Sequence, residues 1–132
     1  MADTAKEFIR AAKNGNVLKL TELLATDKDL LAARDTDGST ALYCAAWKGQ
    51  REAVAFLLEA GADVHTCNSN DHWGTTPLHA AAHANQTAIA GLLIDAGADV
   101  NAKDGNGKTP LYHTTFYKAT ATAKILVKNG AM

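Results

Sequence analysis

Thr76-Pro77-Leu78-His79-Ala80-Ala81-Ala82 is the stretch that decides how this chain of 132 residues folds. It recurs as Thr40-Ala41-Leu42-Tyr43-Cys44-Ala45-Ala46 and as Thr109-Pro110-Leu111-Tyr112-His113-Thr114-Thr115, at spacings of 36 and 33 residues. Each copy is followed by apolar residues and then by a Gly-Ala pair that begins at Gly61, Gly97 or Gly130. The length of 132 residues is four times 33, so the sequence predicts a stack of four similar units.

Each unit is predicted to consist of two short helices joined by a turn and followed by a finger-like loop. In the third unit Thr76 is the expected N-cap and Pro77 the first helical residue, where a missing N–H costs nothing. Gly97 stands where the second helix needs a left-handed residue at its end. The Asp, Asn and Gly residues that follow are typical of turns. Helices this short are not stable alone, so each unit must cover the apolar face of its neighbour.

These residues resemble the ankyrin repeat. Its T-P-L-H-x-A signature is reproduced by residues 76–81, and its G-A-D-V-N-A ending by residues 97–102. The resemblance covers essentially the whole chain. It implies an all-α ankyrin-repeat solenoid, a single domain of four helix-turn-helix units joined by short β-hairpin-like fingers. The expected units are about 1–33, 34–66, 67–102 and 103–132.

The first and last units depart from this pattern, and we expect them to act as caps. A terminal unit needs a polar outer face because no neighbour covers it. The first helix of the first unit carries Lys6, Glu7, Arg10 and Lys13. The second helix of the fourth unit carries Thr120, Thr122, Lys124 and Lys128. These polar residues favour a self-contained stack, the alternative being a fragment of a longer array.

Composition and charge exclude several classes of function. Thirteen basic residues nearly balance 14 acidic ones, giving a net charge of −1, whereas a non-specific nucleic-acid or membrane-surface binder shows a basic excess. No apolar run approaches the roughly 20 residues that cross a bilayer, and the N-terminus lacks the features of a signal peptide. Two cysteines do not make a disulfide framework in a chain of this size. We expect a monomeric, intracellular protein with reduced thiols, most naturally cytoplasmic.

Five histidines and two cysteines are the candidates for metal binding or catalysis. His79 and His83 share a helix face and His72 precedes them, but zinc wants three or four ligands, usually with acidic or thiolate company. Cys67 lies near His72, a pairing that can activate a thiolate, yet no oxyanion hole or orienting group is recognisable. Residues 105–109 end in Gly-Lys-Thr but lack the first glycine of a phosphate-binding loop. We therefore expect no metal, no cofactor and no enzymatic activity.

The positions that the repeat does not dictate carry the functional prediction. In the ankyrin family, partners usually dock on the concave face, which is made by the fingertips and the outward residues late in each first helix. Only eight aromatic residues are present, and half of them fall on these positions, where aromatic side chains are typical anchors of protein interfaces. The finger that ends near Trp73 is three residues longer than its neighbours. The predicted partner-binding residues are Trp47, Lys48, His72, Trp73, His83, Phe116 and Tyr117.

The predicted function is therefore a non-enzymatic protein–protein interaction module, an adaptor or inhibitor that binds another protein on its concave face. The alternative is a structural scaffold piece or a self-associating stack, which would pair through an open C-terminal face or through the aromatic residues. For the aromatic residues themselves, the alternative to partner binding is that Trp47 and Phe116 partly cover neighbouring helices or a cap. His72 and His83 would make binding depend on pH between about 5 and 7. Asn101 lies in a context that resembles ankyrin sites of asparaginyl hydroxylation. The alternative is that its side chain forms a hydrogen bond within its own turn.

Overall fold

The computed structural model describes residues 2–68, 74–115 and 118–132, and over these ranges the chain is helical without strands. The first helices of the four units are α1 (Ala2–Asn14), α3 (Ala41–Lys48), α5 (Pro77–His83) and α7 (Pro110–His113). The second helices are α2 (Val17–Thr26), α4 (Arg51–Glu59), α6 (Thr87–Asp95) and α8 (Thr120–Lys128). A short 3₁₀ helix, η1 (Lys28–Ala32), stands in the first unit where the others have a Gly-Ala turn. The prediction of an all-α solenoid of helix-turn-helix units is confirmed.

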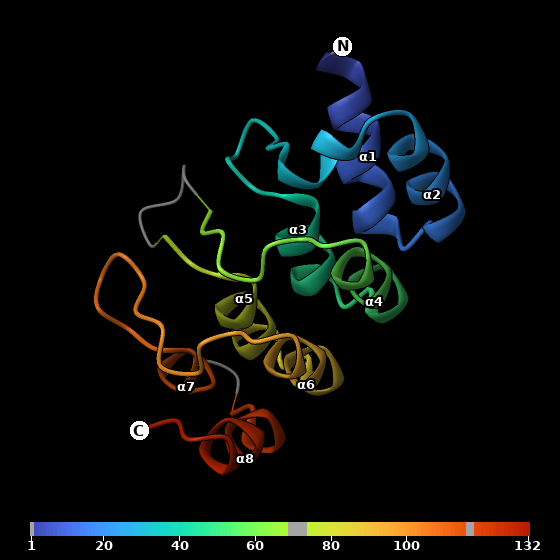
Figure 1. Ribbon diagram of the computed structural model, residues 1–132. Coiled ribbons are helices and arrows are strands. Elements are labelled where there is room, and N and C mark those ends of the chain that lie inside the picture. The colour runs from blue at the N-terminus through green and yellow to red at the C-terminus, as the bar shows by residue number, and fades with distance from the viewer. Residues whose placement is uncertain (1, 69–73, 116–117) are drawn as a thin grey trace.

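The helices form two layers, with the fingers projecting to one side (Figure 1). Successive first helices contact each other more extensively than successive second helices do, because their facing side chains are small. Ala45, Ala46, Ala81 and Ala82 are fully buried between them. The second helices bury larger side chains, including Leu57, Leu93 and Leu126. This difference in side-chain size draws the stack together on the side of the first helices and fingers, which is therefore the inner, concave side.

Local sequence signals set the helix ends as predicted. The side chains of Thr40, Thr76 and Thr109 all cap their helices, and at Thr76 the His79 ring completes a capping box by accepting the Thr76 N–H. Gly61, Gly97 and Gly130 all have φ near 100°, a conformation that L side chains rarely adopt. The fingers have no strands among the described residues, but hydrogen bonds such as Asp104 N to Lys108 O, at 2.8 Å, close them like hairpins.

One residue of the expected polar C-terminal cap, Thr122, is not on the outer face of the fourth unit. Thr122 is completely buried and faces the third unit, where its hydroxyl lies 2.8 Å from that of Thr87 and donates to Asn85 Oδ1 at 3.1 Å. The interpretation of Thr122 as part of a polar outer face is wrong. A threonine cannot be assigned to a helix face from polarity alone, because its hydroxyl can be satisfied by a neighbouring unit.

Gly15 is expected to be a sensitive position, because it ends α1 with φ of 71° and a Cβ there would lie 2.5 Å from Gln50 Oε1. Gly15→Ala would also disturb the 2.8 Å bond from Gln50 Nε2 to Lys13 O that joins the first two units. We expect a loss of about 2–3 kcal/mol of unfolding free energy, measured by urea denaturation. Gly107→Ala is the matched control, since Gly107 has φ of 76° and nothing within 4 Å of its Cβ position. Equal losses in both variants would show that backbone strain, not the contact with Gln50, sets the cost.

No helix found in the described parts of the chain is both long and apolar enough to cross a membrane.

Candidate functional site

The inner surface carries a row of side chains from equivalent positions in successive units. Lys13, Trp47 and His83 each stand two residues before a left-handed residue that ends a first helix. Trp47 is 42% exposed, and its indole stacks on the His83 ring with centroids 5.2 Å apart and planes inclined by 20°. The row therefore presents a cation, a large aromatic surface and an imidazole side by side.

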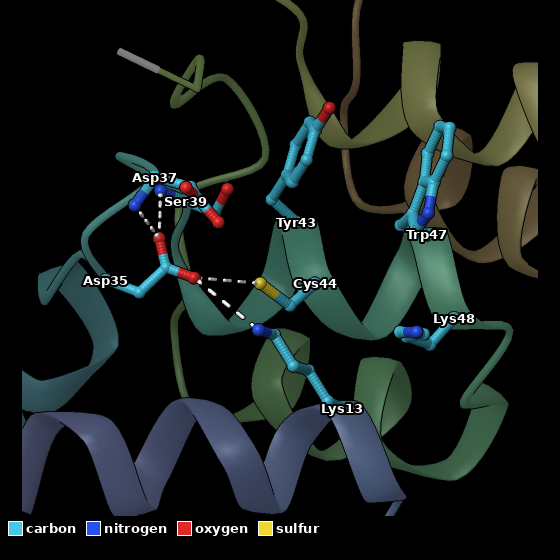
Figure 2. Close-up of a pocket in the computed structure, with 8 residues that line it drawn as sticks. All are labelled: Lys13, Asp35, Asp37, Ser39, Tyr43, Cys44, Trp47 and Lys48. Carbon is cyan, nitrogen blue, oxygen red and sulfur yellow. Dashed lines mark hydrogen bonds and ion pairs between the residues drawn. The ribbon is translucent and has the colours of Figure 1, made fainter. Parts of the chain in front are cut away.

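A pocket of about 210 Å³ lies between this row and the finger that precedes α3 (Figure 2). Asp35 organises it: its Oδ1 accepts from the backbone N–H groups of Asp37 and Ser39, at 2.9 and 3.0 Å. Its Oδ2 lies 3.7 Å from Lys13 Nζ and so ties the finger of the second unit to α1. The lining residues are Lys13, Asp35, Asp37, Ser39, Tyr43, Cys44, Trp47 and Lys48.

A second pocket of about 300 Å³ continues from the first along α1. It is lined by Lys6, Ile9, Arg10, Lys13, Asp35, Thr36 and Asp37. Three residues, Lys13, Asp35 and Asp37, are shared with the first pocket, so the two form one groove. The groove, as the term is used below, also includes His83, whose ring stacks on Trp47 at the edge of the first pocket.

Three cations of the expected N-terminal cap lie along the groove. Lys6, Arg10 and Lys13 line it, and Lys13 is paired with Asp35 of the second unit. Glu7 points away from this surface and lies 3.7 Å from Lys19 of α2. The spacing of Lys6, Arg10 and Lys13 puts them on one face of α1, and this face lies opposite residues 35–37 in the finger of the second unit.

A network of buried polar side chains joins the third and fourth units next to His83. His79 is fully buried: its Nδ1 accepts the Thr76 N–H at 3.1 Å, and its Nε2 donates to Lys108 O at 2.9 Å. Burial lowers the pKa of His79 below its ordinary value of 6.5, with the charge of His113 acting in the same direction. His79 therefore stays neutral and joins the third unit to the finger of the fourth.

Asp104 is the centre of that fourth finger. Its Oδ1 accepts from the backbone N–H groups of Asn106 and Lys108, both at 2.9 Å, and its Oδ2 lies 2.8 Å from His113 Nε2. Burial raises the pKa of this carboxyl, but the hydrogen bonds from His113 and the two backbone groups outweigh burial and leave the pKa below its ordinary value of 3.8. The His113 ring in turn meets the His79 and His83 rings at centroid distances of 5.1 and 5.7 Å.

His79, Asp104 and His113 are close enough to hold a metal ion, with ligand atoms within 4.8 Å of one another. Their hydrogen bonds argue against that use. The lone pair of His79 already accepts a backbone N–H, and its other ring nitrogen carries the proton donated to Lys108 O. Binding a metal through either ring nitrogen would break at least one of these bonds, so the arrangement is suited to holding two units together. Of the histidines considered from the sequence, His79 belongs to this cluster, His83 is not among its members, and His72 lies outside the described residues.

The two thiols lie in different environments, and His72, the expected partner of Cys67, is outside the described residues. Burial, together with the negative charge of Asp35, raises the pKa of Cys44 to about 11, so this thiol stays protonated. Cys67 is exposed, and its Sγ lies 3.7 Å from the carbonyl oxygen of His65. The carbonyl of Cys67 accepts from the Arg34 guanidinium at 2.7 Å, which helps to fix this loop.

Of the predicted partner-binding residues, the structure brings Trp47, Lys48 and His83 to the groove. His72, Trp73, Phe116 and Tyr117 lie outside the described residues. Sequence reasoning did not single out Lys6, Arg10 and Asp35 as groove residues. Lys13 and Asp37 stand at the late-helix and fingertip positions of the expected concave face, although they were not among the predicted partner-binding residues. Alignment of Gly15 with Gly49 places Lys13 on Trp47 and so indicates its position. Asn101, for its part, bonds beyond its own turn: its Nδ2 donates to Gly130 O at 3.1 Å.

The lowered pKa values of His79 and His83 predict how stability depends on pH. Burial is the main cause for both residues, so the unfolded chain takes up protons at a higher pH than the folded chain does. The unfolding free energy should therefore be greatest above about pH 6.5 and fall as the pH is lowered through that value. Asp104 adds a second loss at more acid pH, as its carboxyl becomes protonated. Urea denaturation between pH 7.5 and 5 measures this slope, and a stability that rises on acidification would contradict the assignment.

Comparison with known proteins agrees with this geometry. The family model for ankyrin repeats (three copies) matches residues 8–68 and 63–132. Tyrosine-protein kinase HTK16 of Hydra vulgaris is 30% identical over 131 residues, which are 98% of this chain and 12% of the kinase. The human NAD-capped RNA hydrolase NUDT12 is 39% identical over 64 residues, 48% of this chain and 14% of the hydrolase. The G patch domain and ankyrin repeat-containing protein 1 homolog of Drosophila melanogaster is 38% identical over 64 residues, 48% of this chain and 19% of its own length.

The chain therefore spans less than a fifth of the length of these relatives, and the similarity concerns the repeats. Ankyrin repeats are generally protein–protein interaction modules and are typically non-catalytic. The family match covers nearly the whole chain, and it agrees with the repeated capping threonines, the left-handed glycines and the paired helix layers. The chain therefore belongs to the ankyrin-repeat family.

Proposed function

We propose that this protein is a non-enzymatic adaptor or inhibitor, intracellular and most naturally cytoplasmic, that binds another protein on its concave face. The observation that carries the proposal is the exposure of Trp47 in the groove. A tryptophan that is 42% exposed loses stabilisation by remaining in water, whereas burial against a partner would make it a strong anchor. Its stacking on His83 holds the ring in place before binding, which lowers the entropic cost of association.

Polar residues surround this aromatic anchor. Lys48 is exposed beside Trp47, and Asp37 is exposed on the opposite finger. An apolar anchor surrounded by polar groups is the usual anatomy of a protein interface. His72, Trp73, Phe116 and Tyr117, from the neighbouring finger and the fourth unit, remain part of the proposed surface.

The test is quantitative capture of partners from a lysate of the host cell by immobilised protein. Wild type is compared with Trp47→Ala and with Leu18→Ala, which removes an apolar side chain that is 72% exposed on α2. Binding through the groove predicts that Trp47→Ala weakens capture about 30-fold, or about 2 kcal/mol, while Leu18→Ala has no effect. Circular dichroism should show the same helicity in all three proteins.

One result of this comparison would overturn the proposal directly. Equal capture by Trp47→Ala and wild type would place the binding surface outside the groove. Loss of helicity in Trp47→Ala would show that the indole is needed for folding, in which case His83→Ala, assayed in the same way, decides whether the groove binds.

A self-associating or scaffold role is the second candidate, and it is favoured by the outer face of α8. Val127 is 56% exposed there, on the same side of the helix as Ala123 and Thr120. Sedimentation velocity over a hundredfold range of concentration distinguishes the two roles, since an adaptor remains a monomer and a self-associating stack does not.

A further inference from the structure

Four basic residues line the groove, and their arrangement carries an inference about the partner. Lys6, Arg10 and Lys13 follow one another at intervals of four and three residues, which puts them on a single face of α1. Lys48 extends the series beyond Trp47, at the end of α3. Lys6, Arg10 and Lys48 are exposed, so their charges are available to a ligand.

The acidic residues of the fingers are mostly occupied by internal bonds. Asp35 gives one oxygen to two backbone N–H groups and the other to Lys13. Asp104 in the fourth finger is buried and bonded to His113. Among the lining residues of the two pockets, Asp37 is the acidic residue whose side chain is exposed. The groove is therefore locally basic, although the whole chain has a net charge of −1.

The apolar part of the groove lies next to these cations. Trp47 offers its exposed ring within the pocket that Lys13 and Lys48 also line. A ligand that fits both features carries carboxylates and at least one apolar side chain at close spacing. The guanidinium of Arg10 suits a carboxylate especially well, because it can donate two parallel hydrogen bonds to it.

We propose that the groove binds an acidic segment of a partner protein, whose carboxylates pair with Lys6, Arg10 and Lys48 and whose apolar side chain packs on Trp47. This inference rests on the proposed function and deepens it by naming the chemistry of the partner. Charge complementarity selects this occupant, since a basic segment would face the charges of Lys6, Arg10 and Lys48. A nucleic acid suits the groove less well, because the chain as a whole has no basic excess.

The test begins with a random library of displayed 12-residue peptides selected on the wild-type protein. The proposal predicts that the recovered peptides are rich in Asp and Glu and contain an aromatic or large aliphatic residue. Recovered peptides are then synthesised with a fluorescein label, and their dissociation constants are measured by fluorescence anisotropy. We expect Lys6→Glu/Arg10→Glu to weaken binding at least tenfold, and Trp47→Ala to weaken it as well.

Lys124→Glu/Lys128→Glu is the matched control. It changes the net charge by the same amount, on α8 and away from the groove, and should leave affinity nearly unchanged. Circular dichroism checks that each variant keeps its helices.

The outcomes separate the two proposals. Peptides that depend on Trp47 but are neutral or basic would overturn the acidic segment and leave the groove as a binding site. Acidic peptides weakened equally by both charge-reversal variants would show attraction to the overall charge and would also overturn it. A selection with no peptide that depends on Trp47 would contradict the groove itself. Tighter binding of a labelled single-stranded oligonucleotide than of any peptide would replace the proposed partner by a nucleic acid.

Discussion

Asp104→Ala is expected to lower the unfolding free energy by about 3–5 kcal/mol. The side chain of Asp104 is fully buried and has hydrogen-bond partners on both of its oxygens. Its removal deprives the backbone N–H groups of Asn106 and Lys108 of their acceptor and leaves His113 without the carboxylate that lies 2.8 Å away. A buried group that loses its partner bears its desolvation cost uncompensated, which makes this change more costly than loss of a surface ion pair. Urea denaturation at pH 7 measures the difference.

Asp35→Ala is the internal comparison. Asp35 makes the same pair of turn bonds, to Asp37 and Ser39, but its side chain is 14% exposed and its cation, Lys13, is 40% exposed at 3.7 Å. We expect a smaller loss of about 1–2 kcal/mol, because water can replace part of what is removed. Equal losses in the two variants would mean that the finger turn, rather than the buried contact with His113, determines the cost of replacing Asp104.

The contrast between these two fingers shows how far sequence alone could predict the fold. The capping threonines, the prolines at the helix starts and the glycines at the helix ends act within a few residues of one another. Their consequences were therefore predictable, and the structure has them where expected at Thr76 and Gly97. The contacts between units depend on which side chains face each other across 30 or more residues. Thr122 was misassigned for this reason, since only the packed stack shows it meeting Thr87.

The candidate site divides in the same way. Trp47 and His83 stand at equivalent positions of consecutive units, so the repeat itself predicts that they are neighbours, and they stack at 5.2 Å. Alignment with the repeat indicates the position of Lys13, but not those of Lys6 and Arg10, because the first unit lacks the signature residues and its cations resemble a solvated cap. The pairing of Lys13 with Asp35 shows that this face of α1 is turned towards the finger of the second unit. Four of the predicted partner-binding residues lie outside the described residues, and their roles stay predictions.

His79→Leu is expected to cost about 3 kcal/mol and to weaken the fourth unit more than the first. Leucine fills much of the buried volume but leaves the Thr76 N–H without an acceptor and Lys108 O without a donor. The second of these bonds joins the third unit to the finger of the fourth. Since α7 has only four residues, the fourth unit depends strongly on such contacts with its neighbour.

Hydrogen exchange followed by mass spectrometry distinguishes a local effect from a global one. In His79→Leu we expect exchange to accelerate most in α8 and least in α1, because in a solenoid each unit is stabilised by its neighbours. Tyr43→Phe is the control: it removes the bond between the Tyr43 and Thr75 hydroxyl groups, at 2.8 Å, which joins the second and third units. Tyr43→Phe should lower the unfolding free energy by about 1 kcal/mol, because it removes this partly buried hydrogen bond and keeps the aromatic ring. Uniform acceleration in all helices of His79→Leu would show that the stack unfolds as one cooperative unit, and that the bond to Lys108 stabilises the whole protein rather than the junction it spans.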